Sequence, residues 1–160
     1  MTEPAQATGA KPQKPALAVT LLSGCYERVH FALSLAAAAA ALDRPVVLFF
    51  TMGGCETLRA PNLAGDQTEA VPGWQGLWTE DPSLRDARST DQQFQDQGLP
   101  GLETLLSALS ALGARFLLCE AGLRARKMTQ DNLRQDITLE VTGLVTFLME
   151  TDGFERAQIT

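Results

Sequence analysis

Short apolar runs alternate with helix-like segments along most of this chain. Residues 17–22, 45–51 and 115–119 are apolar at nearly every position. A strand covered by helices on both faces has this pattern, whereas a half-exposed strand alternates apolar and polar side chains. The three runs therefore predict buried parallel strands. Residues 137–141 and 156–160 are predicted to add two more strands.

Helical patterns fill the intervals between these strands. Residues 26–42 carry two apolar stripes and many alanines, which predicts a broadly buried helix that approaches the sheet closely. Residues 100–113 present a leucine face that includes Leu112, with Pro100 suited to the first turn and Gly113 placed to cap the end. Residues 120–128 and 143–150 predict short helices. The inward side of the last helix is expected to hold Leu144, Val145, Phe147 and Leu148.

This alternation is typical of an α/β protein. It predicts a three-layer α/β/α sandwich on a mainly parallel sheet of about five strands. Residues 16–160 are predicted to form a single domain. Residues 1–15, with three prolines and little to bury, are predicted to be a flexible tail. Residues 59–100 are polar and weakly periodic, so they are predicted to be a long excursion from the domain.

Composition narrows the function. The 160 residues are 45% hydrophobic and 20% charged with a net charge of −6, which is ordinary for a globular domain and argues against a nucleic-acid partner. The most apolar stretch, residues 31–50, is broken by charged residues and a proline, so no membrane span is expected. The first residues lack the apolar core of a secretory signal, which favours a cytoplasmic protein.

Three cysteines, Cys25, Cys55 and Cys119, each follow a predicted strand. Because the carboxyl ends of parallel strands meet at one edge of a sheet, this edge is expected to collect the three sulfurs. Cys119 is the strongest candidate for chemistry, since it lies between a strand and a predicted helix start, where backbone N–H groups favour the thiolate. The alternative is a small buried residue that ends the strand.

The other candidates have weaker support. Cys55 and Cys25 are candidate accessory thiols, or incidental small residues in tight loops. The Ser23-Gly24 and Gly53-Gly54 pairs that precede them are hints of an anion or ligand loop. No closely spaced cysteine pair is present, so no metal is expected. Trp74 and Trp78 are predicted to close over a pocket as a lid, to anchor a subunit contact, or to pin the excursion to the domain.

Several stretches carry a resemblance to a known family. They are ALAVTLLSG, FALSLAAAAAALDRPVVLFFTMGG, LETLLSALSALGARFLLCEAG and ITLEVTGLVTFLME. Together they resemble the DsrE/DsrF-like family of sulfur-relay proteins over about residues 17–150. The resemblance implies an α/β/α sandwich, homo- or hetero-oligomers, and in active members a cysteine that carries persulfide sulfur between partners. Cys119 matches the strand-final cysteine of many such relatives.

Three functions follow as hypotheses. In the first, Cys119 holds a persulfide, received from a protein donor and passed to an acceptor thiol, as in a sulfur carrier or sulfurtransferase. This chemistry needs no cofactor, but it needs an exposed thiol of low pKa. In the second, the chain is a ligand-binding or oligomeric assembly module with inert thiols. In the third, Cys119 and Cys55 form a thiol redox pair.

Overall fold

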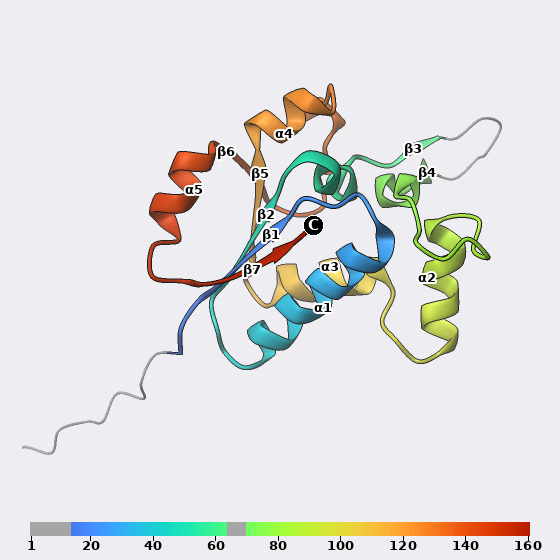
Figure 1. Cartoon of the computed structure of the whole chain (residues 1–160), viewed down its shortest axis with the longest axis horizontal. Coiled ribbons are helices and arrows are strands. Elements are labelled where there is room, and N and C mark those ends of the chain that lie inside the picture. Colours follow the sequence, from blue (N-terminus) through green and yellow to red (C-terminus); the bar gives the residue numbers. More distant parts are fainter. Residues whose placement is uncertain (1–13, 64–69) are drawn as a thin grey trace, which may run out of the picture.

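A five-stranded parallel sheet organises the protein. The computed structural model describes residues 14–63 and 70–160. The strands follow the order β6-β5-β2-β1-β7 across the sheet, and each neighbouring pair is parallel (Figure 1). Their bounds are Leu17–Leu21 for β1, Val46–Phe50 for β2, Arg115–Cys119 for β5, Leu139–Thr142 for β6 and Glu155–Ile159 for β7.

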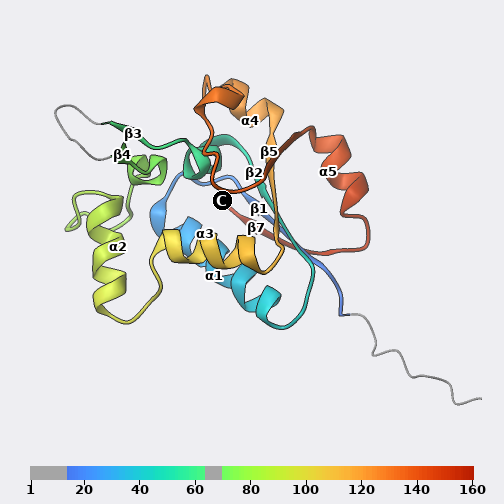
Figure 2. The same ribbon diagram turned by 180° about the vertical axis from the view of Figure 1, so that it is seen from behind.

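Helices cover both faces of this sheet. Helices α1 (Tyr26–Ala41) and α3 (Leu102–Ala111) pack side by side on one face, and α5 (Leu144–Glu150) lies on the other (Figures 1 and 2). Alternate residues of each strand point to opposite faces. In β1, Val19 faces the core under α1 and α3, whereas Ala18 belongs to the smaller core under α5. The predicted three-layer α/β/α sandwich is therefore confirmed.

The core under α1 and α3 is the larger of the two. Strand β2 is buried at every position, as its apolar sequence predicts. The alanines of α1 allow that helix to lie close to the sheet, while leucines of α3 such as Leu106 fill the space beside it. Truncating one such leucine to alanine costs about 2–5 kcal/mol in comparable cores.

Three predicted burial patterns are wrong in part. In α5 only Phe147 is buried, while Leu144, Val145 and Leu148 are exposed, because this short helix covers only part of its sheet face. The second apolar stripe of α1 is also incomplete, since its ends at Phe31 and Leu42 are exposed. Leu112 likewise falls outside the buried face of α3, beyond its last helical turn.

The excursion contains more structure than predicted. It includes the 3₁₀ helix η2 (Gly73–Gly76), while the 3₁₀ helix η1 (Met52–Leu58) lies directly before the excursion. Strands β3 (Asn62–Leu63) and β4 (Ala70–Val71) pair as an antiparallel hairpin. Helix α2 (Ala87–Asp96) was not predicted. Most of the tail predicted over residues 1–15 lies outside the described residues.

Buried hydrogen bonds attach α2 to the domain. The Tyr26 hydroxyl donates to Asp91 Oδ1 at 2.5 Å, and the Leu102 N–H donates to the same oxygen at 2.7 Å. The partners of Asp91 thus come from α1 and the start of α3. Together with the packing of Ala87 and Phe94 on the same core, they explain why this largely polar segment folds as a helix here. Asp86 caps this helix by accepting a hydrogen bond from the Ser89 N–H.

The last part of the chain follows the predicted order. Helix α4 (Glu120–Ala125) begins directly after β5, and the 3₁₀ helix η3 (Gln130–Asn132) follows it. Strand β6 and helix α5 then lead to β7, which returns to the sheet beside β1. Within residues 14–63 and 70–160, every helix is too short or too polar to cross a lipid bilayer.

Candidate functional site

Cys119 lies at the carboxyl end of β5. It is the last residue of that strand and the N-cap of α4, as the sequence predicts. Its side chain is on the sheet face that α5 covers, and it retains only 5% of its full exposure. This thiol is less exposed than sulfur transfer was predicted to require, because residues of α4 and α5 surround the end of the strand.

The remaining access to Cys119 is through a pocket of about 640 Å³. The sheet supplies its floor with Thr20 and Phe49, and α5 supplies one wall with Leu144, Phe147 and Leu148. At its margin lie the charged residues Glu120 and Arg124 from α4 and Arg156 from β7. We call this cavity the α5 pocket.

An aromatic stack fixes the wall of the α5 pocket. The rings of Phe49 and Phe147 are stacked, with centroids 4.1 Å apart and an interplanar angle of 6°. The Arg156 guanidinium lies 5.6 Å from the centroid of the Phe147 ring and donates to the Thr151 carbonyl at 3.0 Å. Strand β7 and helix α5 are thereby joined on one side of the cavity.

Cys55 lies near Cys119 but belongs to the other core. It is fully buried in the cluster under α1 and α3, and its thiol donates to the Phe50 carbonyl at 3.6 Å. Burial, followed by the nearby Cys119 sulfur, raises the pKa of Cys55 to about 12. Cys55 is not among the residues that line the α5 pocket. The two thiols thus point into cores on opposite faces of the sheet.

Gly122 brings α4 against η1 at this edge. A Cβ atom at Gly122 would lie 2.6 Å from the Met52 backbone nitrogen and 3.0 Å from the Cys55 sulfur. Only glycine allows this approach. Because Cys119 caps the same short helix, the contact also sets the position of the Cys119 backbone. Sequence reasoning missed this role of Gly122, although the residue is part of the LLCEAG stretch.

Cys25 occupies a different environment. It is fully buried at the start of α1, its thiol donates to Glu27 Oε2 at 3.1 Å, and burial is the main cause that raises its pKa. Cys25 pairs with Trp78 in an isolated β-bridge, away from the lining of the α5 pocket. The expected gathering of three sulfurs is therefore reduced to Cys55 and Cys119.

The two tryptophans do not line the α5 pocket. Trp74 is buried against Tyr26, with ring centroids 5.8 Å apart, and its indole N–H donates to Glu103 at 2.8 Å. Trp78 is 54% exposed, with the Arg28 guanidinium 5.9 Å from its ring centroid. Trp74 thus holds the excursion against the domain. Neither tryptophan forms a lid over the α5 pocket.

The glycine pairs hold two loops together. A Cβ atom at Gly53 would lie 2.7 Å from the Gly24 nitrogen, and one at Gly54 would lie 2.3 Å from the Leu21 carbonyl oxygen. The Gly54 N–H donates to the Leu22 and Thr51 carbonyls, and Ser23 Oγ accepts from the Cys25 N–H. The Gly54 N–H and Ser23 Oγ thus have partners within the protein, and glycine is needed at positions 53 and 54 because the two loops approach each other so closely.

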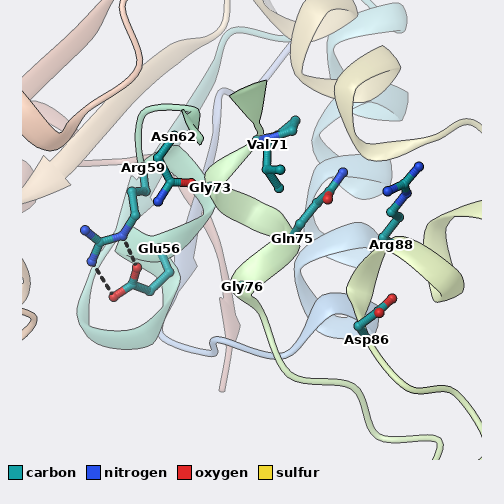
Figure 3. Close-up of a pocket in the computed structure, with 10 residues that line it drawn as sticks. Glu56, Arg59, Asn62, Val71, Gly73, Gln75, Gly76, Asp86 and Arg88 are labelled. Carbon is teal, nitrogen blue, oxygen red and sulfur yellow. Dashed lines mark hydrogen bonds and ion pairs between the residues drawn. The ribbon is translucent and has the colours of Figure 1, made fainter. Parts of the chain in front are cut away.

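A second, polar pocket of about 430 Å³ lies beside η1 and η2. Glu56 and Arg59 line one side, where they are joined at 2.6 Å, while Gln75 and Arg88 lie on the other (Figure 3). Glu56 also pairs with Arg126 at 2.9 Å. Hydrogen bonds from Arg59 are the main cause that lowers the pKa of Glu56. The charge of Arg126, which directly follows α4, is thus partly balanced by this carboxylate.

The described residues hold no cluster of three or more histidine, cysteine or acidic side chains that could bind a metal ion. His30, the single histidine, has its Nε2 2.8 Å from the Pro100 carbonyl oxygen and packs edge-on against Phe94.

The residues of the α5 pocket that were not predicted from the sequence include Phe49 and Arg156. The alternation of β2 and β7 indicates which residues share a face, but the strand order was needed to bring them together.

The fold and the strand-final cysteine define a class of small α/β/α protein with one thiol facing a pocket at the carboxyl edge of its sheet. The model of the DsrE/DsrF-like family matches residues 19–152, and the chain belongs to this family. A search of curated protein sequences gives no significant match.

Solved structures show the same fold. The protein of unknown function MTH1491 from Methanobacterium thermoautotrophicum is similar with a TM-score of 0.55 and 16% identity, over 91% of this chain and 99% of that one. The ychN protein from E. coli is similar with a TM-score of 0.53 and 15% identity, over 91% of this chain and 98% of that one. At these identities the likeness concerns the fold alone.

Proposed function

We propose that this protein is a sulfur carrier or sulfurtransferase that holds persulfide sulfur on Cys119. One observation carries the proposal: Cys119 is the cysteine whose side chain lines the α5 pocket. The sulfurs of Cys25 and Cys55 donate hydrogen bonds to Glu27 and to the Phe50 carbonyl, whereas the Cys119 sulfur has no hydrogen-bond partner among the described residues. Membership of the DsrE/DsrF-like family supports the same chemistry.

The transfer is a balanced exchange between thiols and persulfides. Cys119 loses its proton, and the thiolate attacks the outer sulfur of a donor persulfide, R–S–SH. A new S–S bond forms on Cys119, the S–S bond of the donor breaks, and the donor leaves as a thiolate that takes up a proton. An acceptor thiolate then attacks the outer sulfur of Cys119–S–SH and restores the Cys119 thiolate. No external oxidant, reductant or cofactor enters either step.

The α5 surface is the proposed contact for protein partners. Leu144, Val145, Leu148 and Met149 are exposed on one short helix beside the α5 pocket. Exposed apolar patches of this kind mark interaction sites. We propose that the protein that donates or accepts sulfur in the cytoplasm contacts this helix, because its own sulfur must reach Cys119 through the neighbouring α5 pocket.

Mass spectrometry after incubation with a persulfide donor tests the site. We expect the wild-type chain to gain the mass of one sulfur atom and Cys119→Ser to gain none. Cys25→Ser is the matched control, because Cys25 also follows a strand and caps a helix but does not line the α5 pocket. It is expected to gain sulfur like the wild type. A gain that persists in Cys119→Ser would refute the assignment.

A thiol redox pair is the second candidate function, since Cys55 lies near Cys119. The raised pKa of Cys55, about 12, keeps it protonated near neutral pH, and it faces the opposite core. Both features disfavour attack by Cys55 on an oxidised Cys119. Mild oxidation that yields an intramolecular disulfide in good yield would instead favour the redox pair.

A further inference from the structure

The α5 pocket has apolar walls suited to a small organic molecule. Phe49 lies in its floor, and Leu144, Phe147 and Leu148 of α5 line its side. Its volume of about 640 Å³ falls within the usual range of small-molecule sites, about 300–1,000 Å³. Walls of this composition favour a ligand with an apolar body.

One cation at the margin of the pocket lacks a carboxylate partner. Arg124 lies 3.8 Å from Glu120, so these two charges largely offset each other. Arg156 forms no ion pair with any residue in the described part of the chain, although the protein carries a net charge of −6. One of its nitrogens donates to the Thr151 carbonyl, and a guanidinium has five N–H donors in total.

We propose that the α5 pocket binds a small organic anion with an apolar body, its charged group on Arg156 and its body against Leu148 and the Phe49–Phe147 stack. A polyphosphate is disfavoured because a single guanidinium is left to receive it. The bound molecule covers Cys119, so its presence controls which reagents reach the sulfur. This goes beyond sulfur transfer, because binding requires no sulfur on Cys119.

Three ligands with the same alkyl chain test the proposal. Octanoate, octanol and octylammonium are titrated into the full chain by calorimetry, and the rate of Cys119 alkylation is measured in parallel. We expect saturable binding of octanoate about tenfold tighter than that of octanol, with octylammonium weakest. Octanoate is also expected to slow alkylation of Cys119. If octanoate shows no saturable binding, or binds no more tightly than octanol or octylammonium, the proposal is overturned.

Variants locate the two halves of the site. Arg156→Gln is expected to remove the preference for octanoate over octanol, whereas Arg28→Gln, a remote surface control paired with Glu80, keeps it. Leu148→Asn, at a half-exposed position, and Thr20→Phe, in the floor, add no charge and should weaken the anion and the alcohol alike. A preference that survives Arg156→Gln would contradict the assigned contact.

Two further results separate this inference from others. Octanoate affinity that falls as the protein concentration rises would show that a second copy of the chain occupies the pocket, and would overturn the proposal. Cys119→Ser is expected to bind octanoate like the wild type, although it takes up no sulfur. Loss of sulfur loading and loss of ligand binding are therefore separate failures.

Discussion

The contact between Gly122 and η1 leads to a prediction that runs against helix propensity. Gly122 lies inside α4, where alanine would ordinarily stabilise the helix by about 1 kcal/mol. In this protein the added Cβ would lie 2.6 Å from the Met52 nitrogen and 3.0 Å from the Thr51 Cα. Both neighbours are backbone atoms, so no side-chain rotation relieves the overlap.

The free-energy cost of this clash is therefore expected to exceed the gain in helix propensity. Overpacking of this kind costs about 1–3 kcal/mol, and we expect Gly122→Ala to lower the free energy of unfolding by about 1–2 kcal/mol. The melting temperature should fall by about 2–4 °C for each kcal/mol in a chain of this size. Urea denaturation followed by circular dichroism measures the change. Sulfur loading of Cys119 should slow as well, because the displaced helix begins at that residue.

Gly76→Ala is the matched control. A Cβ atom at Gly76 would have no atom within 4 Å, and its backbone does not require a left-handed conformation. Its free energy of unfolding is expected to change by less than about 0.5 kcal/mol. If Gly122→Ala instead stabilises the protein, as in an unobstructed helix, the proposed packing of α4 on η1 is wrong.

Three further changes test other parts of the structure. Tyr26→Phe removes the hydrogen bond to Asp91 and should lower the free energy of unfolding by about 2 kcal/mol. Amide exchange in α2 should become faster, and an unchanged exchange rate would contradict the role of Asp91 in anchoring this helix. Phe147→Ala should cost about 3–5 kcal/mol in urea denaturation, and a cost near zero would mean that α5 does not pack on Phe49. Burial raises the pKa of Cys55 from 9.0 to about 12, so the unfolded chain loses this proton first as the pH rises. The difference in unfolding free energy between the wild type and Cys55→Ala should be constant below pH 9.0 and should fall by about 1.4 kcal/mol per pH unit between pH 9.0 and about 12. A free-energy difference that stays flat across this range would refute the burial of the Cys55 thiol.

Local patterns were sufficient for the elements with apolar sequences. Residues 115–119 form a strand with the predicted bounds, and Cys119 ends it, because a buried strand must be apolar on both faces. Helix α2 was missed because its stability depends on Asp91, whose partner Tyr26 is 65 residues away. No local period records such a contact.

The site was predictable only in part. The position of Cys119 follows from its strand, but its recessed environment depends on α5 and β7, which meet it only through the strand order. Arg156 shows the same limit, since a polar strand near the chain's end carries no sign that it lies beside Phe147. Cys55 was predicted to share the edge of the sheet with Cys119, yet its side chain belongs to the opposite core.

Peptide-resolved mass spectrometry of the wild-type chain tests the central claim most directly. The protein is loaded with a persulfide donor, freed of donor, blocked by alkylation and digested, before and after addition of an acceptor thiol. We predict the extra sulfur on the peptide that contains Cys119, and its disappearance from that peptide when the acceptor is added. Extra sulfur confined to the Cys25 or Cys55 peptides, or retained on Cys119 in the presence of acceptor, would contradict sulfur transfer by Cys119.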